Sequence, residues 1–311
     1  MDEPNEITGD PRPGESDRTS GLTLETCYRH PNVRTGVHCT RCGRPICTDC
    51  MVEAPIGYQC PNCAGQARSG GRRASIVVRR GGTVTAARAL LVANIAMFVV
   101  EAAIGANAFQ GPGIRTLFDL GALQPIAIAQ GHQYWRLFTA MFLHAGLLHL
   151  VLNMYGLYLF GFLIEDTFGT PAFLGIYFVS GFLASVATYA FGSPNAIAVG
   201  ASGAIFGLLG AWVAYNYRRR GTAMGSANLR TAALIVGLNL VLGFSIAGID
   251  NLAHIGGLVT GVITGFAAEG LSYKRISRAV AIGVFLALVV AGVALTVWRT
   301  SELTRGIPFG L

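Results

Sequence analysis

Two polar residues, Ser202 and His254, each stand near the start of a long apolar stretch of the sequence. Ser202 is flanked by glycine and alanine, and His254 is followed by Ile-Gly-Gly. Neither a hydroxyl nor an imidazole helps a helix to dissolve in lipid, and polar residues inside a membrane usually serve a function. If both stretches enter the bilayer from the same side, the two side chains lie at similar depth and can act as a nucleophile and its general base.

His149 and Asn153 form a second polar pair in an earlier apolar stretch, and His144 precedes them in a His-x4-His-x3-Asn pattern. Residues four apart on a helix share a face. An imidazole and an amide beside a serine can donate hydrogen bonds to a developing oxyanion, and the backbone N–H of Ser202, at a helix N-terminus, adds a donor. We therefore predict Ser202, His254, His149 and Asn153 as the catalytic set.

Structural roles compete with this interpretation. A lone serine in a membrane helix commonly bonds to its own backbone, and a lone histidine can merely bridge two helices. The joint occurrence of both at one depth favours catalysis. Asp250 is expected to cap a helix rather than to complete a triad. Glu165 and Asp166 are expected to be solvated charges, and Trp135-Arg136 to anchor a loop at the membrane interface.

The composition predicts a polytopic membrane protein. Of the 311 residues, 52% are hydrophobic and only 13% are charged, which is far from the balance of a soluble domain. The net charge of +7 would suit nucleic acid, but Lys and Arg gather at the ends of apolar stretches, where they mark topology and contact lipid headgroups. We expect the lipid bilayer, and no nucleic acid, as a partner. The polar, acidic start of the chain shows no secretory signal peptide.

Seven apolar stretches approach the roughly 20 residues that a helix needs to cross a bilayer core of about 30 Å. These spans are expected at 86–106, 146–164, 171–191, 201–217, 230–247, 252–270 and 279–298. The predicted fold class is therefore an all-α polytopic membrane protein. After the last span, residues 299–311 are expected to form a short external tail. The long connection at 107–145 carries aromatic residues and few charges, so we expect it to pack at the outer interface.

Basic residues set the predicted orientation. They precede the first span and fill the connections between the fourth and fifth and between the sixth and seventh spans. With seven spans all three clusters fall on one side, which the positive-inside rule makes cytoplasmic. The predicted localisation is a multi-pass protein of the cell membrane with a cytoplasmic N-terminus. His149, Ser202 and His254 then lie close to the outer boundary, so the active site is expected near the outer face.

All seven cysteines lie between Cys27 and Cys63, and with one histidine they form four pairs with two intervening residues. The expected metal ligands are Cys27, His30, Cys39, Cys42, Cys47, Cys50, Cys60 and Cys63. Four such ligands saturate one tetrahedral structural zinc, so eight imply two Zn²⁺ ions and no cofactor for catalysis. The close spacing of the middle pairs favours interleaving, the first pair with the third and the second with the fourth. Sequential pairing stays open, and His38 could replace His30.

The Cys-rich block, 25–65, has too little core to fold alone, so metal is expected to supply most of its stability. We expect residues 1–24 to be disordered and 66–85 to form a flexible basic linker to a membrane domain at 86–298. Saturated zinc sites leave no open position for catalysis. The block is therefore interpreted as a binding module for a cytosolic partner or for the protein's own oligomer, or as a plain folded plug.

The membrane part resembles the rhomboid family of intramembrane serine proteases over roughly 86–298. Four separate motifs carry the resemblance, namely Trp135-Arg136, His144-x4-His149-x3-Asn153, Gly200-Ala-Ser-Gly and Ala253-His-Ile-Gly-Gly. The resemblance implies a six-helix core with a seventh helix appended at the C-terminus, and a membrane-embedded first loop at 107–145. It also implies a Ser202–His254 dyad without an acidic third member, and an oxyanion site formed with His149 and Asn153.

Two further points follow from resemblance. Phe206 stands where the rhomboid family often has a tyrosine, so the aromatic floor under the histidine is kept without its hydroxyl. The Cys-rich block resembles B-box-like, cross-braced zinc modules.

The activity that the resemblance implies is cleavage of transmembrane protein substrates near the outer end of a helix that unwinds easily. Movement of the fifth span and the loop after it is expected to admit the substrate laterally. The alternative is a catalytically inactive, rhomboid-like adaptor that binds membrane clients, which would need neither Ser202 nor His254. A small-solute transporter would predict broken helices and an internal repeat, and the sequence shows neither clearly.

Overall fold

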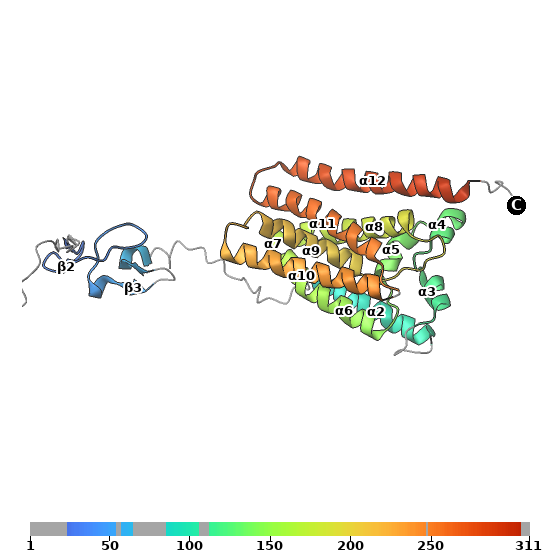
Figure 1. The fold of residues 1–311 in the computed structure, drawn as a ribbon, viewed down its shortest axis with the longest axis horizontal. Helices are drawn as coiled ribbons and strands as arrows, with labels where there is room; N and C mark the ends of the chain where they lie inside the picture. Colours follow the sequence, from blue (N-terminus) through green and yellow to red (C-terminus); the bar gives the residue numbers. More distant parts are fainter. Residues whose placement is uncertain (1–23, 54–56, 65–84, 106–111, 247, 306–311) are drawn as a thin grey trace, which may run out of the picture. The chain divides into compact units, whose positions relative to one another are not determined.

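The structure, a computed structural model, describes residues 24–53, 57–64, 85–105, 112–246 and 248–305 (Figure 1). The chain divides into two compact units, residues 1–82 and 83–311. The segment expected to be disordered, 1–24, and the expected linker, 66–85, lie almost wholly outside the described residues, as does the end of the predicted tail. Each unit is described by itself below.

The first unit is built from very short elements. β1 (Glu25–Thr26) pairs with β2 (Arg34–Thr35), and β3 (Val52–Glu53) pairs with β4 (Tyr58–Gln59), both antiparallel. A 3₁₀ turn, η1 (Thr48–Cys50), precedes β3. The buried core of the described part consists of six cysteines and Ile46. So small an apolar core contributes little to stability, which agrees with a unit that depends on bound metal.

The second unit is a bundle of long helices (Figure 1). Those that matter for the site are α2 (Ala86–Gly105), α6 (Leu147–Gly156), η3 (Leu157–Gly161), α7 (Phe162–Phe168), α8 (Thr170–Phe191), α9 (Ser202–Tyr217), α10 (Ala223–Ser245), α11 (Asn251–Ser272) and α12 (Arg278–Thr304). α6, η3 and α7 form one continuous helix, in which η3 is a π-helical segment. The predicted all-α membrane fold is confirmed.

Six of the seven predicted spans are helices long and apolar enough, by length and composition, to cross a membrane. The remaining one is also a helix, α9, but it has only 16 residues. At 1.5 Å per residue it rises about 24 Å, less than the about 30 Å of a bilayer core. A helix this short must begin or end inside the hydrocarbon layer, which offers a place for a polar residue below the membrane surface.

α9 lies at the centre of the bundle. Nearly every residue from Gly203 to Ala211 is buried, and the helix packs against α8, α10 and α11. This explains its uniform apolarity, because a helix covered on all sides has no polar face.

Glycines bring the backbones of α9 and α11 into direct contact. A methyl group added to Gly257 would overlap the backbone of Gly203, and one added to Gly261 would overlap that of Gly207. Small residues at such an interface allow two membrane helices to approach closely. The contact fixes the register of the two helices whose first turns carry Ser202 and His254.

The long connection before α6 folds into short helices, α3 (Ile114–Leu120), α4 (Pro125–Gly131), α5 (Arg136–Thr139) and η2 (Ala140–Phe142). Arg136 is buried in it and donates hydrogen bonds to the carbonyls of Phe118, at 2.7 Å, and Ala122, at 2.8 Å. Its guanidinium also lies over the ring of Phe118. Arg136 therefore holds the connection together from within.

Glu165 corrects a sequence-based expectation. It was expected to be a solvated charge, but its side chain is buried and accepts hydrogen bonds from the backbone N–H groups of Ala86 and Ala87, both at 3.0 Å. Thr170 donates a further bond at 2.7 Å. A carboxylate here satisfies free amides at the start of α2 and complements the helix dipole. Asp166 is exposed, as expected.

α12 continues to Thr304, six residues beyond the predicted end of its span, so part of the expected tail is helical. Its last turns pack on α4 and on the end of α8, where the hydroxyls of Tyr189 and Thr300 are 2.7 Å apart. The appended helix thus supports the connection that lies next to the start of α9.

Candidate functional site

Ser202 and His254 meet in the second unit. Ser202 is the first residue of α9, and its Oγ lies 3.0 Å from Nε2 of His254 in the first turn of α11. That is a normal hydrogen-bond distance. With Nε2 as the acceptor, the neutral imidazole carries its proton on Nδ1. Nε2 of His254 can therefore accept the hydroxyl proton of Ser202 as Oγ attacks a carbonyl carbon.

The imidazole of His254 is held by stacking. The ring of Phe206 lies parallel to it, at an interplanar angle of 6° and a centroid distance of 4.2 Å. Nδ1 of His254 is buried, and no residue in the described part of the chain pairs with it. An aromatic floor, rather than an acidic partner, therefore sets the orientation of the imidazole.

Asp250 belongs to the helix start and not to a triad. Its Oδ1 accepts from the backbone N–H of Ala253 at 3.0 Å, which makes it the N-cap of α11, as the sequence predicted. Its Oδ2 accepts from the hydroxyl of Thr188 in α8. The carboxylate thus joins α8 to the start of α11 one turn before His254.

Gly200 shapes the approach to Ser202. Its φ of +125° favours glycine, and an added Cβ would lie 2.8 Å from Cε1 and Nε2 of His149. Its N–H donates to the carbonyl of Ala140 at 2.9 Å. Two residues earlier, Ala198 exchanges backbone hydrogen bonds with Leu123. The long connection before α6 therefore positions the segment that leads into α9.

Backbone donors surround Ser202. The N–H groups of Ser202, Gly203 and Ala204 have no hydrogen-bond partner among the residues that the structure describes, and the first α9 amide bonded backward is that of Ile205. Such free amides at a helix N-terminus attract negative charge. They can stabilise an oxyanion formed beside Ser202 Oγ.

His149 adds a side-chain donor on the opposite wall. Its Nδ1 accepts from the backbone N–H of Ala145 at 3.3 Å, and the ring edge with Cε1 and Nε2 lies beside Gly200. His144 lies edge-on to this ring, at 5.3 Å between centroids. The structure therefore brings His149 beside the segment that carries Ser202.

Asn153 lies one turn further along α6. Its Nδ2 donates to the carbonyl of His149 at 2.9 Å, and its buried Oδ1 has no partner in the described residues. Gly156, on the same face of the helix, contacts Ile205 of α9. Asn153 therefore lies on the α6 face that neighbours α9, but it forms no hydrogen bond to Ser202 within the described part of the chain.

Two features near this site were not predicted from the sequence, the conformation of Gly200 and the burial of Glu101. The positive φ of Gly200 becomes visible only once the chain is folded. Glu101 is buried in α2 and contacts the backbone of His144. The sequence could have indicated a buried role for Glu101, because it is the single charged residue between Arg88 and Arg115 in an apolar stretch.

The first unit holds two clusters of metal-ligating side chains. Cys27, His30, Cys47 and Cys50 form one, and Cys39, Cys42, Cys60 and Cys63 form the other, with the ligand atoms of each set within 4.8 Å of one another. This is the interleaved pairing that the spacing favoured. His38 lies outside both clusters and faces Glu25 at 3.5 Å.

The distances in the clusters fit a tetrahedral ion. Thiolates at about 2.3 Å from such an ion lie about 3.8 Å apart, and the sulfurs of Cys42 and Cys60 are separated by 3.8 Å. Nδ1 of His30 lies 3.1 Å from the sulfur of Cys47 and 3.5 Å from that of Cys50. The donor set of thiols and one imidazole is the one that zinc prefers.

The pKa is lowered for three of these thiols, Cys27, Cys39 and Cys60. Burial raises the pKa of Cys27, but backbone hydrogen bonds at Arg29 and Cys47 outweigh it and lower the pKa to about 6. The same balance, with backbone bonds at Cys60 and Arg41, lowers the pKa of Cys39 to about 6. Thiolate is the form that binds metal.

Comparison with known proteins places this site in a described domain. Residues 131–269, which include all four predicted catalytic residues, match the family model described as Rhomboid domain. RHOMBOID-like protein 6, mitochondrial, of Arabidopsis thaliana is 41% identical over 168 residues, 51% of this chain and 52% of that protein. Rhomboid protease GluP of Bacillus subtilis (strain 168) is 40% identical over 163 residues, 52% of this chain and 30% of that protein.

One similar protein is named as inactive. Inactive RHOMBOID-like protein 8 of Arabidopsis thaliana is 33% identical over 162 residues, 50% of this chain and 44% of that protein. The chain spans about half the length of the first relative and less of the other two. Residues 131–269 match a rhomboid domain, and the described residues include six helices able to cross a membrane. The chemistry of the site has to be argued from its own residues.

Proposed function

We propose that the protein is a serine endopeptidase that cleaves transmembrane proteins within the bilayer. The observation that carries this proposal is the 3.0 Å contact between Ser202 Oγ and His254 Nε2, beside the His149 ring and amides that have no partner among the described residues. The similarity to a protein named Rhomboid protease GluP supports it. Polar residues inside a membrane segment usually serve a function, and a serine and a histidine in hydrogen-bond contact suit this one.

The reaction is an acyl transfer through Ser202. His254 Nε2 accepts the hydroxyl proton while Oγ attacks the scissile carbonyl carbon. The resulting oxyanion is stabilised by the N–H of Ser202 and by the Nε2–H of His149, with Asn153 one turn away. As the intermediate collapses, His254 gives its proton to the leaving amine. Water, deprotonated by the same imidazole, then attacks the acyl-enzyme and releases Ser202.

The stacked Phe206 suits an imidazole that works without an acidic partner. A ring held by π-stacking keeps its plane while it gains and loses a proton, and the flanking helices limit its rotation. Phe206 provides this stacking without a hydroxyl.

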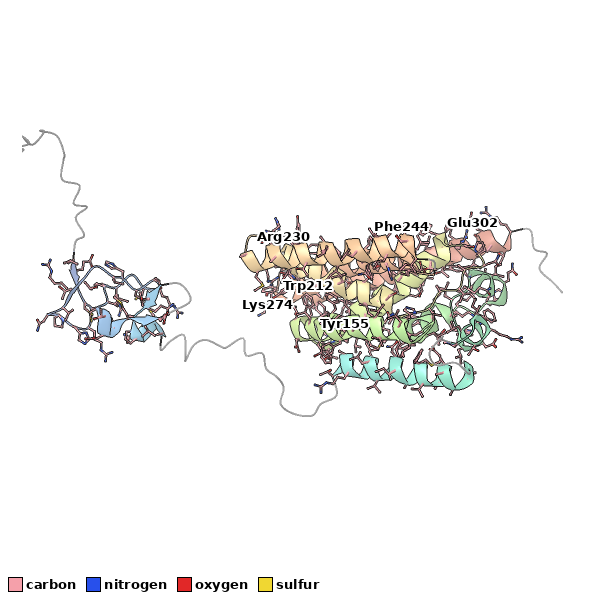
Figure 2. The ribbon with its side chains drawn as sticks, turned by 60° about the horizontal axis from the view of Figure 1, so that its bottom comes forward. Tyr155, Trp212, Arg230, Phe244, Lys274 and Glu302 are labelled. Atoms are coloured by element: carbon pink, nitrogen blue, oxygen red, sulfur yellow. The ribbon has the colours of Figure 1, made fainter. Side chains whose placement is uncertain are left out.

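Substrate entry is proposed beside α10. Of its described residues only Gly225 and Ala232 are buried, and Phe244 near its end is 78% exposed (Figure 2). An apolar cavity of about 330 Å³ lies between part of α10 and the helices α9 and α11, lined by residues such as Val213, Val236 and Val262. A helix with so few buried contacts moves at a low cost in free energy.

A crosslink between α10 and α6 tests this entry route. It should block cleavage of membrane substrates, and unimpaired cleavage would refute entry there.

The central experiment is covalent labelling of the full chain in detergent micelles with a fluorophosphonate probe, alongside cleavage of a transmembrane reporter. Wild type is expected to be labelled and to cleave, and Ser202→Ala to do neither. His254→Ala is expected to abolish turnover. Labelling that persists in Ser202→Ala would end the assignment of Ser202 as the nucleophile.

A second candidate is a client-binding adaptor without catalysis, favoured by the similarity to a relative named as inactive. It predicts that wild type binds transmembrane helices but neither reacts with the probe nor cleaves the reporter. Under this hypothesis Ser202→Ala and wild type behave alike in every assay, so the same experiment separates the two functions.

For the first unit we propose two structural Zn²⁺ ions, one in each cluster, and a role in binding a cytosolic protein. The thiol and imidazole donors and their tetrahedral spacing support zinc. Metal analysis of purified protein is expected to give two zinc ions per chain, and about one in a Cys42→Ser variant. A full-length protein purified without zinc yet with a folded first unit would contradict the proposal.

The proposed orientation places the N-terminus in the cytoplasm and Ser202 near the outer face. Figure 2 shows Arg230 and Lys274 at one end of the bundle and Glu302 at the other. Arg218, Arg219 and Arg220 follow α9 at the basic end, while Ser202 opens the same helix at the opposite end. A membrane-impermeant thiol reagent added to intact cells should label a cysteine introduced at position 305 and none introduced at position 220.

A further inference from the structure

Glu101 is a buried carboxylate that the proposed reaction does not use. It lies near the end of α2, is 0% exposed, and is the single charge between Arg88 and Arg115. Burying a carboxylate is costly unless a hydrogen bond compensates. Its Oε2 accepts from the backbone N–H of His144 at 3.1 Å, while Oε1 has no partner in the described residues. Because burial of this carboxylate is costly, its hydrogen bond to His144 indicates a structural or functional role.

The next amide in the chain reaches the proposed oxyanion site. The N–H of Ala145 donates to Nδ1 of His149 at 3.3 Å. A backbone N–H can only donate, so Nδ1 must be the unprotonated nitrogen, and a neutral imidazole then carries its proton on Nε2. Nε2, together with Cε1, lies on the edge of the ring nearest Gly200, two residues before Ser202.

Two consecutive amides therefore have two different acceptors, a carboxylate on α2 and an imidazole on α6. We infer that Glu101 is a positioning residue: by holding the N–H of His144, it orients the following peptide group so that Ala145 fixes His149 with Nε2–H toward Ser202. This inference rests on the proposed function for the rate effect that it predicts, but the tautomer of His149 can be measured without any activity.

Substitutions at Glu101 separate this role from simple packing. Glu101→Gln keeps an oxygen acceptor at the same reach, so its kcat should stay within about twofold of wild type. Glu101→Met has a similar shape but no acceptor, and Glu101→Asp withdraws the carboxylate by one methylene. Both should lower kcat about 10- to 100-fold with KM nearly unchanged, because one oxyanion donor is worth about 10² to 10³ in kcat.

A double-mutant cycle tests whether the effect passes through His149. Single-turnover cleavage is compared for wild type, Glu101→Met, His149→Ala and the double variant. The effect of Glu101→Met should vanish in the His149→Ala background. An equal loss in both backgrounds would overturn the inference, since a packing defect acts independently of His149. Asn94→Leu is the matched control: it removes another buried polar side chain two turns earlier on α2 and should leave kcat near that of wild type.

The tautomer is read directly by ¹⁵N NMR of histidine-labelled full-length protein that carries Ser202→Ala, with the His149 signals assigned by their absence in His149→Gln. The protein with Glu101 intact and the Glu101→Gln variant should both show an unprotonated Nδ1 and a protonated Nε2. The Glu101→Asp and Glu101→Met variants should show a mixed or reversed pattern, and an unchanged Nδ1 signal in both would overturn the inference. Failure of wild type to cleave would count against the proposed function alone, and the NMR result would still decide the role of Glu101.

Discussion

The two units of this chain solve the problem of compactness in opposite ways. In the first unit, the described core consists of six cysteines and Ile46. The ligand atoms gather in two clusters, and we expect metal bound there to stabilise the unit in place of a large apolar core. In the second, α9 and α11 approach until backbone touches backbone, because side-chain atoms are absent at Gly257 and Gly261. We propose that the first unit depends on bound metal, whereas the second depends on the absence of side chains at these glycines. We therefore expect each unit to be destabilised by a different change.

Removal of metal is expected to have the largest effect. Structural zinc contributes about 10–16 kcal/mol to the folding of small zinc domains, and the first unit has little else. Chelation of full-length protein should unfold residues 24–64, seen by proteolysis or NMR, while fluorophosphonate labelling of Ser202 continues. Loss of labelling on chelation, restored by Zn²⁺, would show that the second unit depends on the first.

Filling the α9–α11 contact is expected to have the next largest effect. A side chain at Gly261 meets backbone that cannot move aside, so Gly261→Leu should cost about 3 kcal/mol or more. It should also abolish cleavage by separating the helices that carry Ser202 and His254. Gly237→Leu is the matched control, because Gly237 in α10 has open space where a Cβ would lie. Thermal unfolding in micelles and reporter cleavage should distinguish the two variants.

A substitution at Gly200 should lower activity much more than it lowers stability. Gly200→Ala is expected to displace His149 and to lower kcat about 100-fold, the worth of an oxyanion donor, with a cost in stability of about 1–2 kcal/mol for the left-handed conformation. Gly169→Ala carries a similar backbone strain at a φ of +83° with no close neighbour. Equal kcat values for the two variants would remove Gly200 and His149 from the proposed site.

The smallest effect is expected where α12 meets α8. Tyr189→Phe removes the hydrogen bond to Thr300 and leaves the packing intact, so stability should fall by about 1 kcal/mol with kcat unchanged. Urea or thermal unfolding of the variant measures it, and Thr300→Val should add nothing further in the double variant. A large drop in kcat would instead mean that α12 transmits strain to the site through the connection at 112–146.

Much of the site was predictable because its parts are short, local patterns. The His144–His149–Asn153 spacing places two of these side chains on one helical face whatever the fold, and a Cys-x2-Cys pair offers two ligands from one turn. Asp250 was recognised as a cap for the same reason. Glu165 and Glu101 were not recognised, because each carboxylate accepts from amides far away in the sequence.

The sequence by itself determined that most of the chain is apolar helix, that four Cys/His pairs of a kind able to bind metal precede it, and that serine and histidine stand at the starts of two spans. Tertiary structure alone decided that cysteine pairs interleave, that α9 is enclosed by its neighbours, and that Ser202 Oγ comes within hydrogen-bond reach of His254 Nε2. Spacing along a chain governs which groups share a turn. Only packing, here between glycine-bearing helices, governs which turns come together.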